Sequence, residues 1–115
     1  MTNEKKIAVI GSGSWATAIV KILSNNTSSI LWYFRNENDI TYLKNYGHNP
    51  KYLSSVQFDV TKLELCSNVQ TAVSKADIII LAVPSAFINE TIKNIPNQLF
   101  ENKKVFSAIK GIVPE

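Results

Sequence analysis

The sequence predicts an α/β domain built on a doubly wound, mostly parallel sheet. Two observations carry this prediction. Short apolar runs alternate with segments of helical spacing along the whole chain, and the first apolar run is followed at once by a glycine-rich turn. Strands and helices in strict succession imply right-handed crossovers, which make the strands parallel and place helices on both faces of the sheet.

The first half of the chain supplies two strand–helix units. The apolar run 7–10 predicts a strand buried on both faces, and residues 14–23 have apolar side chains at helical spacing. Residues 29–34 predict a second strand, and residues 36–46 a polar helix. The sequence Gly-His-Asn-Pro at 47–50 is strong turn chemistry.

The second half continues the alternation. Residues 62–65 alternate and predict an edge strand, and Asn68 is expected to cap a short helix that ends at residue 76. The most apolar segment, 77–83, predicts a central strand. Ser85 is expected to cap a helix that Pro96 ends, and residues 104–109 predict a last strand. Because the chain stops before a helix covers that strand, we expect a truncated domain.

The composition fits one globular domain. The chain has 115 residues, of which 45% are hydrophobic and 18% charged, unlike a disordered tail. The net charge of +3 is mild and shows no basic stripe, so we expect no nucleic-acid partner. No apolar stretch is long enough for a membrane span or a signal peptide. We therefore expect a cytoplasmic protein without a membrane partner.

Cysteine and histidine are too few to build a site. The single Cys66 excludes a disulfide framework, and no cluster of metal-binding side chains predicts a metal centre. His48, the only histidine, stands in a turn beside Pro50. We interpret it as structural.

The turn after the first predicted strand carries a dinucleotide fingerprint, Gly11-Ser12-Gly13-Ser14-Trp15-Ala16. Gly11 permits the tight turn, Gly13 leaves room for a pyrophosphate, and Ala16 lets the helix lie close to the strand. Free N–H groups and the positive dipole end of the helix favour phosphate. A strand–turn–helix can also use such glycines only for the backbone conformation of the turn. Their place in the alternating pattern nevertheless predicts a Rossmann-like nucleotide-binding domain.

The end of the second strand lacks the carboxylate that usually binds the ribose of NAD. Arg35 stands near that position, where an arginine can pair with a 2′-phosphate, although it can equally be a solvated surface residue. Glu37 and Asp39 follow closely enough to neutralise it. Phe34 and Trp32 alternate onto one face, where both can be core residues.

Two further strand ends are candidate positions, because ligands bind beyond the carboxyl ends of parallel strands. Phe87 follows the first of them and can line a cofactor groove, although an aromatic in the first turn of a helix is more often core. Lys110 ends the last strand before Gly111, which directs a cation toward an anionic substrate.

Taken together, these motifs resemble the glycerol-3-phosphate dehydrogenase family in order and spacing over the whole chain. The matching segments are Gly-Ser-Gly-Ser-Trp-Ala at 11–16, Leu-Trp-Tyr-Phe-Arg at 31–35, His-Asn-Pro-Lys-Tyr-Leu at 48–53, Val-Pro-Ser-Ala-Phe at 83–87 and Ser-Ala-Ile-Lys-Gly at 107–111. The tryptophan within the fingerprint and the Asn-x-x-Tyr-Leu pattern are more specific than the glycines. The chain departs from the common pattern at Ala16, usually glycine, and at Ser54, where proline often follows.

The resemblance implies interconversion of dihydroxyacetone phosphate and sn-glycerol 3-phosphate, a phospholipid precursor, with NADH or NADPH. It implies that Gly11 to Ala16 hold the pyrophosphate, with Ser12, Ser14 and Trp15 among the contacts. Phe34 and Arg35 match positions at the adenosine end, and Phe87 matches an aromatic lining the cofactor site. Lys110 matches a lysine that touches both cofactor and substrate.

The resemblance also implies a C-terminal helical domain that supplies the general acid/base. Residues 1–115 are then an incomplete dinucleotide-binding domain with no catalytic residue of its own, which is expected to show no turnover alone. The sequence does not reveal the oligomer, and a homodimer is one option for the full-length enzyme. Two alternatives stay open: the nucleotide-binding half of another reductase, such as a ketopantoate reductase, and a non-catalytic dinucleotide-sensing module.

Overall fold

The computed structural model describes residues 5–27, 29–53, 55–83, 85–93 and 95–107 of the chain. The strands are β1 (Ile7–Ile10), β2 (Ile30–Tyr33), β3 (Leu63–Cys66), β4 (Ile78–Leu81) and β5 (Lys104–Ser107). The α-helices are α1 (Ser14–Ser24), α2 (Glu37–Tyr46), α3 (Val69–Lys75) and α4 (Ser85–Ile92), and two 3₁₀ helices are η1 (Val60–Lys62) and η2 (Asn97–Phe100).

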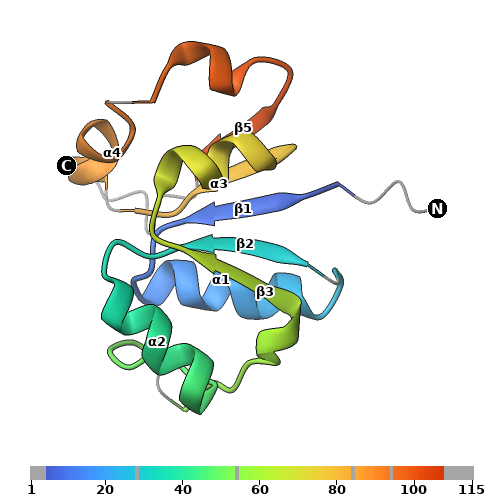
Figure 1. Ribbon diagram of the computed structural model, residues 1–115, viewed down its shortest axis with the longest axis vertical. Coiled ribbons are helices and arrows are strands. Elements are labelled where there is room, and N and C mark those ends of the chain that lie inside the picture. The colour runs from blue at the N-terminus through green and yellow to red at the C-terminus, as the bar shows by residue number, and fades with distance from the viewer. Residues whose placement is uncertain (1–4, 28, 54, 84, 94, 108–115) are drawn as a thin grey trace.

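The described strands form one sheet in the order β3-β2-β1-β4-β5, and every neighbouring pair is parallel. The chain winds outward from β1 to β3, and then returns to add β4 on the other side of β1 (Figure 1). This confirms the predicted doubly wound sheet. It also confirms an edge position for β3 and an internal one for β4.

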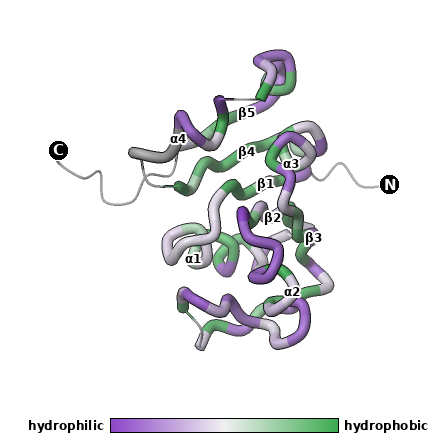
Figure 2. Tube along the Cα trace, turned by 60° about the vertical axis from the view of Figure 1, so that its left-hand side comes forward, coloured by the Kyte–Doolittle hydropathy of each residue, from purple (hydrophilic) through white to green (hydrophobic). Residues whose placement is uncertain are grey.

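Alternation along the strands builds two hydrophobic cores, one on each face of the sheet. The face toward α1 and α2 buries ten residues, which are Val9, Ala16, Val20, Ile30, Trp32, Phe34, Ile40, Leu43, Phe58 and Ala82. The face toward α3 and η2 buries Ala8, Ile10, Leu31, Ala72, Val73, Ala76, Ile79, Leu81 and Ile95. The strands β1 and β4 are accordingly hydrophobic along their length (Figure 2).

The helix boundaries follow local chemistry. The Asn36 side chain accepts a hydrogen bond from the Asn38 N–H at the start of α2 (2.8 Å). Gly47 ends that helix with a left-handed φ of 80°, where an L side chain would be strained. Asn68 caps α3 by accepting from the Thr71 N–H (3.0 Å), as predicted.

Two details differ from the sequence-based expectation. The helix α4 begins at Ser85 itself, so this residue lies within the first turn instead of capping it. The helix then ends at Ile92 and is followed by η2, which the pattern does not predict. Pro96 accounts for the break, because it lacks an N–H donor and disfavours helical backbone in the residue before it.

Candidate functional site

A cleft of about 650 Å³ lies at the carboxyl ends of β1, β2 and β4. The winding direction of the chain reverses between β1 and β4, and this switch point is where open α/β sheets bind ligands. The cleft is lined by Gly11, Ser12, Gly13, Tyr33, Arg35, Asn36, Asp39, Lys51, Tyr52, Ala82, Val83, Glu90 and Thr91. Four of these residues, Gly11, Ser12, Gly13 and Arg35, are among the site residues expected from the sequence.

Gly11 makes the turn after β1 possible. Its φ of +133° is a backbone conformation that residues with side chains rarely adopt. A Cβ at this position would also collide with the backbone carbonyl group of Ala82 at the end of β4. Only glycine therefore lets β1 and β4 stay paired while the chain turns toward α1.

Gly13 has a different function from Gly11. A Cβ at Gly13 would meet nothing within 4 Å. Packing of the protein therefore does not require glycine here, and the missing side chain leaves open space beside the turn. Gly13 is the N-cap of α1 and makes no side-chain cap hydrogen bond. The N–H groups of the first helical turn have no acceptor within the helix and are available to an anion.

Ala16 serves packing against the core and not open space. It is fully buried in the core cluster that contains Val9 and Trp32. The helix thus lies close to the strand, which is the role expected for a small residue at this position.

The carbonyl groups of the glycine turn are all held by the protein. The Trp32 Nε1 donates to the Gly11 oxygen (2.7 Å), and the Thr17 hydroxyl donates to the Gly13 oxygen (2.7 Å). The Asn49 Nδ2 donates to the Ser12 oxygen (3.1 Å). Because side chains of the protein donate to all three carbonyl oxygens, the N–H groups of the turn remain for a ligand.

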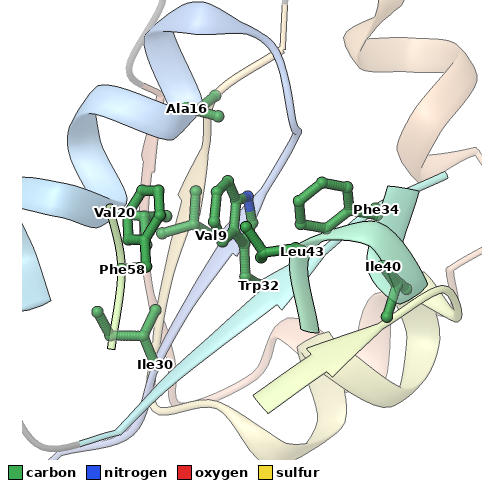
Figure 3. Close-up of a cluster of buried hydrophobic side chains, with 10 residues drawn as sticks. Val9, Ala16, Val20, Ile30, Trp32, Phe34, Ile40, Leu43 and Phe58 are labelled. Atoms are coloured by element: carbon green, nitrogen blue, oxygen red, sulfur yellow. The ribbon is translucent and has the colours of Figure 1, made fainter. Parts of the chain in front are cut away.

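Trp32 is itself fixed by aromatic packing. Figure 3 shows its ring between those of Phe58 and Phe34, whose centroids lie 5.3 Å and 4.6 Å from it. All three rings belong to one buried cluster. The indole N–H is thus directed at the turn by a rigid core.

Phe34 does not reach the cleft. Its side chain is fully buried beside Trp32, because the alternation of β2 directs residues 32 and 34 to the same covered face. Contact with adenosine, which the resemblance implies, is therefore not available to Phe34 in this structure. Phe34 is a core residue, which is the other role that its position in the sequence allowed.

Arg35 is exposed and lines the cleft together with Tyr33. Partial burial raises the pKa of the Tyr33 phenol, and the nearby Arg35 guanidinium opposes that shift. The two acidic residues that follow Arg35 have other partners. The Asp39 carboxylate is 3.4 Å from the Lys51 ammonium, and the Glu37 carboxylate accepts from the Ser67 hydroxyl (2.9 Å).

Lys51 and Tyr52 are cleft residues to which sequence reasoning gave no role. They follow the turn after α2, and no local pattern places that turn beside the glycine loop. The signal that could have drawn attention to them is the Asn-x-x-Tyr-Leu motif, which the resemblance contained.

Two further expected site residues, Ser14 and Trp15, do not line the cleft. Trp15 is 42% exposed on α1. Lys110 and the side chain of Phe87 lie outside the described residues.

The described part of the chain contains no group of three or more His, Cys, Asp or Glu side chains placed to hold a metal ion. None of its helices is both long and apolar enough for a membrane crossing.

A doubly wound parallel sheet with a glycine turn at its switch point is the architecture of dinucleotide-binding domains. Residues 6–115 match the family model described as the NAD-dependent glycerol-3-phosphate dehydrogenase N-terminus. The chain belongs to this family, which confirms the resemblance found in the motifs.

Individual relatives agree with the family match. The chain is 37% identical over 108 residues to a glycerol-3-phosphate dehydrogenase [NAD(P)+] of Staphylococcus carnosus, covering 93% of this chain and 32% of the relative. A relative of the same name from Macrococcus caseolyticus is 37% identical over 110 residues, covering 95% and 32%. The chain thus spans about a third of the length of these curated relatives.

A solved structure shows the same fold. The glycerol-3-phosphate dehydrogenase of Saccharomyces cerevisiae superimposes with a TM-score of 0.82 over 93% of this chain and 34% of the other, at 22% identity.

Proposed function

We propose that this chain binds NAD(P)H with the pyrophosphate at the glycine turn and the adenosine end beside Tyr33 and Arg35. The observation that carries the proposal is the open space at Gly13, next to a turn whose three carbonyls are engaged by the protein. Such a turn presents N–H donors and the positive end of the α1 dipole, which favour a diphosphate.

The activity we propose for the whole protein is the reduction of dihydroxyacetone phosphate to sn-glycerol 3-phosphate, and its reverse. The family match and the names of the relatives support it. Bound NAD(P)H would supply the hydride that the carbonyl carbon receives, and the carbonyl oxygen would take a proton from the general acid. In this proposal Lys110 faces the substrate phosphate or the developing alkoxide, and a helical domain supplies the general acid/base.

Within this proposal residues 1–115 are the nucleotide-binding part and show no turnover alone. The whole enzyme works in the cytoplasm on a small molecule, as a homodimer that binds no nucleic acid. Its product serves phospholipid synthesis. The mild net charge of +3 and the single cysteine support the cytoplasmic placement and the lack of a nucleic-acid partner. Turnover by the whole protein separates this enzyme from a module that only senses the dinucleotide.

A titration calorimetry series tests nucleotide binding directly. NADH, NADPH and AMP are added in turn to the protein. We expect both dinucleotides to bind more tightly than AMP, because only they carry a diphosphate for the glycine turn. If AMP binds as well as NADH, the glycine turn is not the pyrophosphate site.

Arg35 is proposed to make the protein accept NADPH at least as well as NADH. The Asp39 carboxylate pairs with Lys51, and the Glu37 carboxylate accepts from the Ser67 hydroxyl. Among the described residues neither carboxylate forms an ion pair with Arg35, so its guanidinium can pair with a 2′-phosphate. A charge-assisted hydrogen bond contributes about 1.5–3 kcal/mol, which corresponds to roughly 10- to 150-fold in affinity.

Arg35→Ala should therefore weaken NADPH binding by about tenfold or more and leave NADH binding nearly unchanged. Arg35→Lys is the matched control, which keeps the charge but not the bidentate geometry and should fall between the two. Competition binding of both cofactors measures the ratio. A tenfold preference of the wild type for NADH, or equal losses for both cofactors, would contradict this role.

A further inference from the structure

Asn49 does not line the cleft, yet its buried side chain makes four hydrogen bonds beneath it. It is 1% exposed. Its Nδ2 donates to the Ser12 carbonyl and to the Thr17 hydroxyl oxygen, both at 3.1 Å. Its Oδ1 accepts from the backbone N–H groups of Lys51 (2.8 Å) and Tyr52 (3.2 Å). A primary amide has two donors and two lone pairs, so its full hydrogen-bonding capacity is used.

The two halves of this amide hold two different walls of the cleft. The donor half holds the glycine turn, through Ser12. The acceptor half holds residues 51 and 52, which line the cleft from the segment after α2. One buried side chain thus fixes the separation between the pyrophosphate turn and the opposite wall.

Thr17 fixes the orientation of the Asn49 amide. Its side chain is fully buried, and its hydroxyl donates to the Gly13 carbonyl (2.7 Å). Because a hydroxyl has one proton, only a lone pair faces Asn49, which must therefore present its NH₂ group. The turn, the threonine and the asparagine form one chain of hydrogen bonds without a net charge.

We propose that Asn49, together with Thr17, is a positioning residue that holds the glycine turn in the shape that receives a diphosphate. This inference rests on the proposed dinucleotide binding and names the residues that set the geometry of that site. The glycine turn binds the diphosphate. Loss of the hydrogen bonds made by Asn49 and Thr17 should therefore weaken only ligands that carry a diphosphate. A merely structural role would instead lower stability without changing the preference of the folded protein for ADP over AMP.

Two substitutions at Thr17 form the central test. Thr17→Val keeps the shape but removes the hydroxyl, and Thr17→Ser keeps the hydroxyl but removes the methyl group. Calorimetry with ADP and AMP should show ADP bound about five- to tenfold more weakly by Thr17→Val, with AMP changed less than about twofold. Thr17→Ser should retain the wild-type preference for ADP. Circular dichroism checks whether each variant is folded.

Asn49→Asp supplies a second, separate test. The aspartate keeps an acceptor for Lys51 and Tyr52 but replaces the donor toward Ser12 and Thr17 by an oxygen. The same selective loss of ADP affinity is expected in the folded variant. If Asn49→Asp does not fold, the two Thr17 variants decide.

Two results would overturn the proposal. One is an unchanged ADP preference in folded Thr17→Val, and the other is an equal loss for ADP and AMP. Failure of the underlying function looks different, because the wild type would then bind neither NADH nor ADP.

Discussion

Two polar clusters lie at opposite edges of the parallel sheet, at the carboxyl and at the amino ends of its strands, and they differ in chemistry. At the carboxyl ends, buried neutral side chains hold the glycine turn through Trp32, Thr17 and Asn49. At the amino ends, the Glu64 carboxylate lies between the ammonium groups of Lys6 (3.4 Å) and Lys75 (2.7 Å), and its side chain is 41% exposed.

The difference shows at which edge of the sheet the side chains are held in one arrangement. A buried donor or acceptor that loses its partner costs about 1–3 kcal/mol, whereas an exposed ion pair contributes about 0.2–1 kcal/mol because water and salt replace it. The carboxyl end is therefore held in one arrangement, as a binding site needs. The amino end tolerates rearrangement.

The largest effect on stability is expected at Gly11. Gly11→Ala places a methyl group against the Ala82 carbonyl in a strained backbone conformation. The strain costs about 1–3 kcal/mol and the overpacking about 1–3 kcal/mol, so the free energy of unfolding should fall by roughly 2–6 kcal/mol. Gly13→Ala is the matched control, with open space around it and an expected loss below about 1 kcal/mol. Urea denaturation compares them, and equal losses would refute the distinct roles of the two glycines.

Trp32→Phe should have the next largest effect. The variant keeps an aromatic ring in the core but leaves the Gly11 carbonyl without its donor, which costs about 1–3 kcal/mol in addition to the removed ring atoms. Phe58→Leu changes the same cluster without removing a hydrogen bond and should cost less than about 1.5 kcal/mol. Thermal unfolding of both variants measures the difference. A smaller loss for Trp32→Phe than for Phe58→Leu would argue against a structural hydrogen bond to the turn.

The smallest effect is expected at the exposed cluster. The hydrogen bond from Lys75, followed by the charges of both lysines, lowers the pKa of the Glu64 carboxyl. Its stabilisation is therefore present above the ordinary value near 4.5 and is lost as pH falls through the lowered folded-state value. Glu64→Gln should cost about 0.2–1 kcal/mol at pH 7.

The pH dependence provides the control for Glu64. The difference in stability between Glu64→Gln and the wild type should disappear in acid, where the wild-type carboxyl is protonated as well. It should also shrink in high salt, which screens exposed charges. A difference that persists at both extremes would indicate a packing effect and not the ion pairs.

Local patterns predicted the frame of the fold but not the contacts that hold the site. The strands, the helices and the fingerprint at 11–16 follow from apolar spacing and from short turn motifs, which act within a few residues. The bonds to the turn join residues 21, 37 and 32 positions apart, in the pairs Trp32–Gly11, Asn49–Ser12 and Asn49–Thr17. Their formation depends on how α1, β2 and the segment after α2 pack together.

The same limit explains Phe34 and Lys51. Alternation placed Phe34 on the face of Trp32, but it could not show that α1 and α2 cover that face completely. The pairing of Lys51 with Asp39 needs the chain to turn back at residues 47–50, and sequence predicts that turn but not its direction. Motif resemblance marked the Asn49 segment as unusual, and only the structure shows what it holds.

NADH titration of the wild type and of Gly13→Val tests whether the glycine turn binds the pyrophosphate. A Cβ at Gly13 meets nothing within 4 Å, so the valine side chain should enter the open space beside the turn and the fold should be retained. We predict that the folded variant binds NADH at least about tenfold more weakly, because the pyrophosphate can no longer approach the backbone. Unchanged affinity for NADH in a folded Gly13→Val protein would show that the pyrophosphate does not bind there and leave the glycine turn with a structural role only.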